Sequence, residues 1–115
     1  MKFFLPYPPS INNYLGRSTS GRLYIKQAGL DFRKRLKVCV LLHGFRHTYT
    51  TPIKIDYIVY PPDRRIRDID NIEKALFDAL TKAEVWADDS LIKDRHSAWG
   101  EVKQFGTIEL EIKHM

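Results

Sequence analysis

Two aspartates and a lysine in residues 67–74 have spacings suited to metal-dependent phosphate chemistry. Asp68 and Asp70 are two positions apart, just before a stretch of helical periodicity. An extended backbone there would point both carboxylates the same way. Carboxylate oxygens are the hard ligands that Mg²⁺ takes, together with waters and substrate phosphates. Lys74 lies one helical turn beyond Asp70, so its ammonium group could oppose charge that develops on a phosphate during cleavage.

A second acidic pair, Asp88 and Asp89, follows the same helical stretch. The two acidic clusters can meet if the chain doubles back. Convergent carboxylates repel one another unless a cation neutralises them. The pattern therefore predicts a divalent-metal site that Asp68 and Asp70 share with the Asp88–Asp89 pair, with Mg²⁺ as the expected ion and Mn²⁺ as a possible substitute.

A simpler interpretation of the same residues stays open. Asp70 is a good helix N-cap, and Glu73 three residues later would complete a capping box. Lys74 would then only pair with Asp78 on the helix surface. Adjacent acids such as Asp88 and Asp89 are ordinary turn formers.

Basic residues precede the first acidic pair. Arg64, Arg65 and Arg67 could hold flanking phosphates while a metal holds the phosphate to be cut, or they could be a solvated loop. The formal net charge of +5 favours a polyanionic partner such as nucleic acid. Four further residues could extend this basic surface: Arg17, Arg22, Lys26 and Arg33.

The composition, 43% apolar and 12% aromatic, is typical of a folded globular chain, and 115 residues fit one domain over residues 1–115. Only Cys39 is present, so no internal disulfide can form, which favours a reducing setting. No stretch approaches the ~20 apolar residues of a membrane span. A soluble, cytoplasmic protein is therefore expected. The absence of a dinucleotide fingerprint or a Walker loop indicates no small-molecule cofactor.

Hydrophobic periodicity predicts an α+β domain with a mixed β-sheet and two helices. Strands are expected at residues 2–5, 52–60, 92–99 and 107–113, and helices at residues 25–42 and from 70 to about 83. The first helix is expected to bury a face that includes Ala28, Phe32, Leu36 and Val40. Residues 10–24, rich in Asn, Gly and Ser, are expected to form a long ordered loop.

Several of these segments together resemble one known family. The matching segments are Pro-Pro-Ser-Ile-Asn-Asn-Tyr at 8–14, Gly-Arg-Leu-Tyr at 21–24, Pro-Asp-Arg-Arg-Ile-Arg-Asp-Ile-Asp-Asn at 62–71, Lys-Ala-Leu-Phe-Asp-Ala-Leu at 74–80, and Asp-Asp at 88–89. They resemble the RusA family of Holliday junction resolvases, and the resemblance covers nearly the whole chain.

The resemblance implies a homodimeric, Mg²⁺-dependent endodeoxyribonuclease that nicks opposed strands of a four-way DNA junction in recombination and repair. It implies that Asp68, Asp70 and Asp89 are essential carboxylates and that Lys74 is an essential base or charge stabiliser. Asn71 and Asp88 also match and are taken as supporting residues. Glu84 departs from the family pattern, because members often have glycine at this helix end, where a left-handed residue caps the helix.

Other functions remain compatible with the sequence. A non-catalytic basic DNA-binding module would use the acidic residues only as caps and turn formers, and it would bind DNA without nicking it. A degenerate member of the family could act as an interaction protein. A nuclease for other branched nucleic acids would share the chemistry and differ in its substrate.

Overall fold

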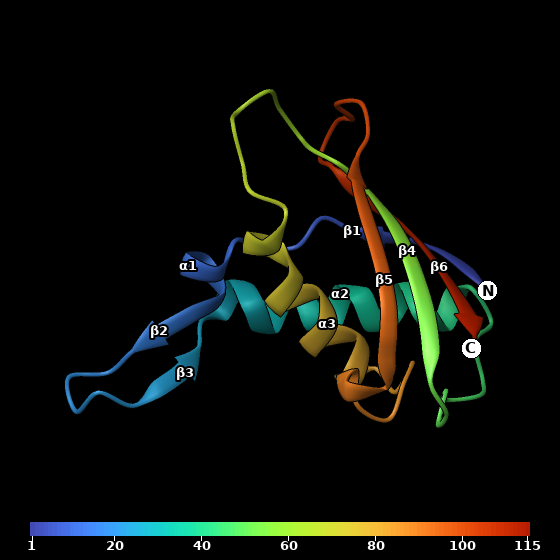
Figure 1. The fold of residues 1–115 in the computed structure, drawn as a ribbon. Helices are drawn as coiled ribbons and strands as arrows, with labels where there is room; N and C mark the ends of the chain where they lie inside the picture. Colours follow the sequence, from blue (N-terminus) through green and yellow to red (C-terminus); the bar gives the residue numbers. More distant parts are fainter.

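The computed structural model describes residues 1–115. Along the chain, the elements are β1 (Lys2–Pro6), α1 (Ile11–Tyr14), β2 (Leu15–Arg17), β3 (Leu23–Ile25), α2 (Gln27–Leu42), β4 (Ile53–Tyr60), α3 (Asp70–Lys82), the 3₁₀ turn η1 (Asp89–Leu91), β5 (Ile92–Trp99) and β6 (Thr107–His114). Figure 1 shows their arrangement. The two long helices and the four main strands lie within two residues of their predicted bounds.

The main sheet has the strand order β1-β6-β4-β5. β4 pairs with β5 in parallel and with β6 antiparallel, so the sheet is mixed, as predicted. Ile53, Ile55, Tyr57 and Val59 of β4 alternate towards the core and are buried. β5 is an edge strand and most of its residues are exposed. One edge of β5 therefore lacks a strand partner.

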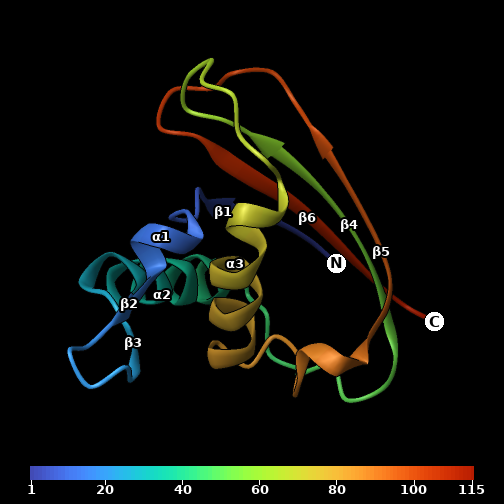
Figure 2. The same cartoon turned by 60° about the vertical axis from the view of Figure 1, so that its left-hand side comes forward.

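Helices α2 and α3 cover one face of this sheet (Figure 2), which confirms the α+β class. The apolar stripe of α3 is buried as predicted, from Ile72 to Leu80. α2 buries the predicted Phe32, Leu36 and Val40, but Gly29 takes the inward position expected for Ala28. A side chain at Gly29 would collide with Tyr14, because its Cβ would lie 2.6 Å from the tyrosine ring. No helix is both long and apolar enough to span a membrane.

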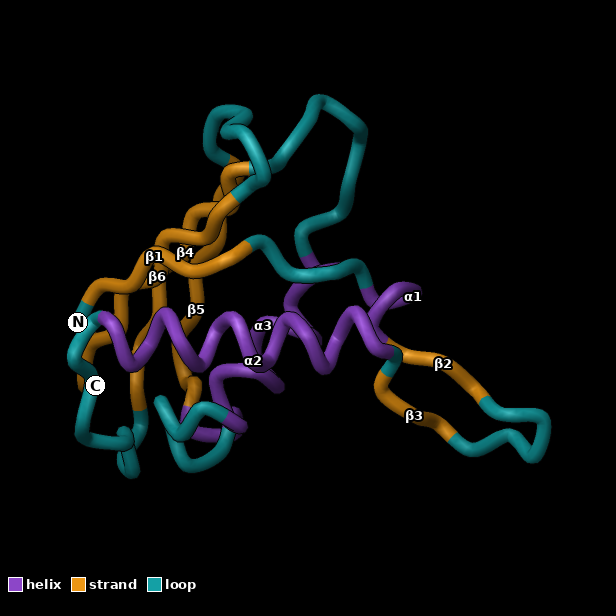
Figure 3. The backbone as a smooth tube through the Cα atoms, turned by 180° about the vertical axis from the view of Figure 1, so that it is seen from behind, coloured by secondary structure: helices purple, strands orange, loops and turns teal.

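Residues 10–24 differ from the expected long loop. They form α1 and then a hairpin of β2 and β3, in which Leu15 pairs with Ile25 and Arg17 with Leu23. The hairpin extends away from the body of the molecule (Figure 3). Each strand is only three residues long, which is too short to show a period-two pattern in the sequence. Ile25, expected at the start of the first helix, ends β3 instead.

The end of α3 supports the sequence-based reasoning about Glu84. Glu84 has a left-handed backbone with φ 61°. The Glu84 N–H donates to Thr81 O and the Val85 N–H donates to Leu80 O, which is the Schellman arrangement that caps a helix. The chain turns here without glycine, and the strain falls on Glu84.

Glu84→Gly is therefore expected to stabilise the fold by roughly 0.5–1 kcal/mol, because glycine adopts this conformation without a steric penalty. The greater freedom of glycine in the unfolded chain offsets part of this gain. Chemical denaturation of the wild-type and Glu84→Gly proteins measures the difference in the free energy of unfolding. Lys82→Gly, which places glycine within the last turn of α3, is the matched control and should destabilise. An unchanged or lowered midpoint for Glu84→Gly would contradict the assignment of strain to this residue.

Candidate active site

A cavity of about 360 Å³ opens at the N-terminal end of α3. Asp68 and Asn71 line one side of it, and Pro8, Ser10 and Asn13 line the other. The structure thus brings the Pro-Pro-Ser segment near the N-terminus against the acidic segment that precedes α3. Arg65 and Arg67 complete the wall, so positive and negative side chains face the same hollow.

The backbone between Asp68 and Asp70 differs from the expected extended form. Ile69 has φ −64° and ψ −32°, which is helical. The Asn71 N–H already donates to Asp68 O at 3.1 Å. Side chains two positions apart do not face each other on a helical backbone. The prediction that an extended chain aligns these two carboxylates is therefore wrong, although both remain exposed at the same end of α3.

The helix-capping interpretation of Asp70 is also wrong. The N-cap position belongs to Ile69, no side chain caps the helix, and Asp70 is the first helical residue. Glu73 does not reach back to the helix start, because it bonds to the sheet. The Asp70 carboxylate therefore stays exposed and unoccupied by helix amides, and an anion at this position is favoured by the helix dipole.

Glu73 anchors α3 to the sheet. Tyr57 of β4 donates its hydroxyl proton to Glu73 Oε2, and Arg95 of β5 lies 3.2 Å from Glu73 Oε1. Burial, and then the bond to Glu73, raise the pKa of Tyr57 well above its usual value. Sequence reasoning missed this link. Its one signal was a tyrosine at an inward position of β4, where a buried hydroxyl needs a partner.

Lys74 behaves as the simpler interpretation predicted. Its Nζ lies 3.3 Å from Asp78 Oδ1, one helical turn further on. Asp78 also accepts a hydrogen bond of 2.8 Å from Tyr14, and Arg33 lies 4.0 Å away. Burial, and then the bond to Asp78, raise the pKa of Tyr14 to about 12. With 52% of its side chain exposed, Lys74 is nevertheless accessible from solvent.

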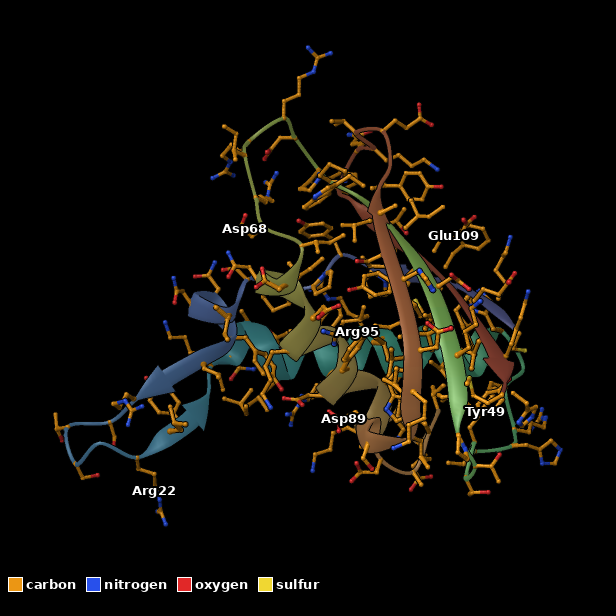
Figure 4. All side chains as sticks on the ribbon, viewed as in Figure 1. Arg22, Tyr49, Asp68, Asp89, Arg95 and Glu109 are labelled. Carbon is orange, nitrogen blue, oxygen red and sulfur yellow. The ribbon has the colours of Figure 1, made fainter.

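Asp89 lies away from the other two aspartates. In Figure 4, Asp68 is near the upper end of α3 and Asp89 is below its lower end. The 13 residues of α3 correspond to a rise of roughly 20 Å. No group of three acidic, histidine or cysteine side chains in the chain could hold a metal ion. The expected convergence of Asp68, Asp70 and Asp89 does not occur within one subunit.

Asp88 and Asp89 have different surroundings. The Asp88 side chain accepts a hydrogen bond of 2.8 Å from the Ser90 N–H and caps η1. This bond lowers the pKa of Asp88. Asp89 instead lines a cavity of about 280 Å³ together with Phe77, Lys93 and Arg95. Asp88 thus shapes the turn that presents the carboxylate of Asp89.

Comparison with known proteins decides the family. The family described as "Endodeoxyribonuclease RusA" matches residues 6–113. The chain belongs to the RusA family. A protein of Shigella sonnei called "Crossover junction endodeoxyribonuclease RusA" is 39% identical over 111 residues, which is 96% of this chain and 92% of the relative. Relatives with the same description in Escherichia coli K12 and Enterobacteria phage 82 are 38% and 39% identical over the same share of both chains.

Membership of the RusA family confirms the expectation of a nuclease fold and class. It argues against the non-catalytic module, because the relatives are described as endodeoxyribonucleases. In this RusA-family chain the simple capping role is also excluded for Asp70.

The arginines of the 61–69 loop are not equivalent. Asp63 accepts bonds from the backbone N–H and guanidinium of Arg65, and lies 2.7 Å from Arg67. These bonds, the backbone bond first, lower the pKa of Asp63 to about 2. Arg67 also lies over the ring of Tyr7 and is mostly covered. Arg64 is exposed and Arg65 keeps 81% of its side chain exposed, so these two can reach a ligand.

Proposed function

We propose that this chain resolves four-way DNA junctions by Mg²⁺-dependent, paired nicking as a homodimer. One observation carries the proposal: Asp68 lines a cleft edged by Arg65 and Arg67, and the exposed carboxylate of Asp70, unused by the helix cap, lies two residues further on at the start of α3. The relatives are described as crossover junction endodeoxyribonucleases. A four-way junction is approximately two-fold symmetric, so a two-fold dimer offers one site to each of two equivalent strands.

The third carboxylate of each site comes from the partner subunit in this proposal. β5 starts beside Asp89 and runs opposite to α3, towards the end that holds Asp68 (Figures 1 and 4). An exposed edge strand is a ready surface for pairing with a second copy. Antiparallel pairing of β5 with its copy would carry the partner subunit's Asp89 towards Asp68 and Asp70. Two complete sites would form, and neither would exist in a monomer.

The donor set fits Mg²⁺ in kind, because it consists of carboxylate oxygens with room for water and phosphate. A bound Mg²⁺ would activate water and stabilise the leaving oxygen. Lys74, released from Asp78, would place its ammonium group against the charge on the phosphate. Asp88 would hold the η1 turn behind Asp89, and Asn71 would contact the same cleft as Asp68.

The structure separates the seven basic residues proposed for DNA contact into two groups. Arg17, Arg22, Arg64 and Arg65 are exposed, and Arg22 points away from the body on the hairpin (Figure 4). The remaining three are only partly exposed and bond within the protein: Arg33 to Tyr14, Lys26 to Asn12 and Arg67 to Asp63. In the exposed group, Arg17 and Arg65 also make internal bonds, to Gly21 O and to Asp63. The proposal assigns the phosphate contacts to the first group, and a supporting role in the fold to the second.

Arg64→Ala is expected to weaken junction binding several-fold at moderate salt and to reduce the slope of log affinity against log salt by about 1. The reason is the loss of one phosphate contact with its counterion release. Arg46→Ala, which removes an exposed arginine that lines a different cavity, is the matched control and should leave the slope unchanged. Equal effects of the two substitutions would contradict the placement of DNA along the 61–69 loop.

A labelled synthetic four-way junction tests the function. The purified protein with Mg²⁺ should make paired, symmetry-related nicks, and EDTA should prevent them. A flap of the same sequence should be cut far more slowly. Efficient cutting of the flap alone would favour the nuclease for other branched DNA, and salt-sensitive binding without any nicks would favour the non-catalytic module.

A further inference from the structure

Two large apolar side chains are exposed on neighbouring loops near the candidate cleft. Ile66 is fully exposed and Phe105 is 83% exposed. Ile66 belongs to the 61–69 loop, and Phe105 belongs to residues 100–106 between β5 and β6. The two loops lie side by side at the same end of the sheet (Figures 1 and 2). The Lys103 N–H joins them by donating to Pro61 O at 2.9 Å.

The backbone at Phe105 is unusual for an aromatic residue. Phe105 has φ 67°, and the Gly106 N–H donates to Lys103 O to close a tight turn. Turns with a positive φ at this third position strongly favour glycine or asparagine. A bulky residue there is strained, and its exposed ring adds little to the core. A strained position of this kind points to a role outside the fold.

The turn is fixed in place around Phe105. Lys103 Nζ lies 3.9 Å from the centre of the Tyr60 ring. Gly106 packs so closely on Tyr7 that a Cβ would lie 2.8 Å from the Tyr7 ring. Phe105 therefore projects from a turn that is held on both sides rather than from a loose tip.

Two exposed arginines, Arg64 and Arg65, flank Ile66 on the 61–69 loop. Asp63 on this loop is already engaged by Arg65, and the 100–106 loop carries one lysine, Lys103, and one glutamate, Glu101. Asp68 follows Ile66 by two residues, at most about 7 Å along the chain. A ligand that is negatively charged and has a flat apolar face matches this surface, and an unpaired nucleobase with its phosphates is such a ligand.

We propose that Phe105 and Ile66 form a stacking platform for an unpaired base at the branch point of DNA. This inference rests on the proposed function, because it assumes a DNA substrate. In an intact duplex the base faces are covered by their neighbours, whereas a branch point can release a base. The platform would thereby favour branched DNA over duplex, next to the carboxylates that are proposed to hold the metal.

The test uses a four-way junction with 2-aminopurine at the branch point and the full-length protein in EDTA, so that no cleavage occurs. Wild-type protein should raise the emission, because the base leaves the DNA stack. Phe105→Ala should suppress this rise and weaken junction binding by about 10-fold, with duplex binding unchanged. Phe105→Trp should keep both properties. Phe4→Ala removes another exposed phenylalanine, on β1, and should have no effect.

Phe105→Gly separates loss of the ring from loss of the fold, because glycine relaxes the turn. This variant should bind the junction as weakly as Phe105→Ala does, and its melting temperature should equal or exceed that of the wild type. An unchanged emission rise and unchanged junction preference in Phe105→Ala would overturn the inference alone. Conversion of the Phe105→Ala protein to a lower oligomeric state would also overturn it, by placing the ring in a subunit interface. A wild-type protein that does not prefer the junction to duplex would overturn the proposed function as well.

Discussion

Asp70→Asn is expected to reduce the rate of junction cleavage by about 1,000-fold or more while leaving junction affinity within a few-fold of wild type. The substitution removes a charged oxygen ligand and keeps the shape of the side chain. It breaks no contact of the fold, because the Asp70 carboxylate is exposed and makes no cap bond. Single-turnover cleavage in Mg²⁺ and junction binding in EDTA measure the two quantities.

The matched control is Asp31→Asn. Asp31 is an exposed aspartate on α2 that only accepts a hydrogen bond from Gln27. Its substitution changes the net charge by the same amount as Asp70→Asn and should leave cleavage unaltered. Normal cutting by the Asp70→Asn protein in Mg²⁺ would remove Asp70 from the site.

A mixture of Asp70→Asn and Asp89→Asn subunits is expected to regain cleavage that neither variant has alone. If each site takes Asp68 and Asp70 from one subunit and Asp89 from the other, one site of the mixed dimer is intact. That site combines Asp68 and Asp70 of the Asp89→Asn subunit with Asp89 of the Asp70→Asn subunit. The second site carries both substitutions and is inactive. Mixed dimers carrying two affinity tags should therefore make single nicks at about half the wild-type rate per dimer.

The control for this experiment is a mixed dimer of Asp68→Asn and Asp70→Asn. Each of its two sites loses one ligand, because the same subunit supplies both Asp68 and Asp70 to a site, from the N-terminal end of its α3 and the residues just before it. This mixture should stay inactive. Inactivity of the Asp70→Asn and Asp89→Asn mixture as well would indicate that each subunit builds its site from its own three aspartates.

The secondary structure was largely predictable because its signals are local. The stripe of apolar residues on α3 and the alternation in β4 each span enough residues to define a period. The left-handed turn at Glu84 agrees with the glycine that the family resemblance indicates at this helix end. The β2–β3 hairpin could not, since strands of three residues carry no such pattern.

The residues of the candidate site stay a prediction, and their geometry was predicted only in part. Asp68, Asp70 and Lys74 are close in sequence, so their shared location followed directly. The helical state of Ile69 was missed because it depends on where the first turn of α3 begins. The separation of Asp89 was missed although the length of α3 was predicted, because the expected return of the chain towards Asp68 depends on the path after Glu84.

The most direct test of the composite site is to locate Mn²⁺ by anomalous diffraction in crystals of the protein soaked with the ion. A site shared between subunits predicts a peak contacted by Asp68 and Asp70 of one subunit and by the partner subunit's Asp89, once per subunit. A peak contacted by carboxylates of a single subunit would contradict the shared site. A peak that lies far from Asp89 of both subunits would also contradict it.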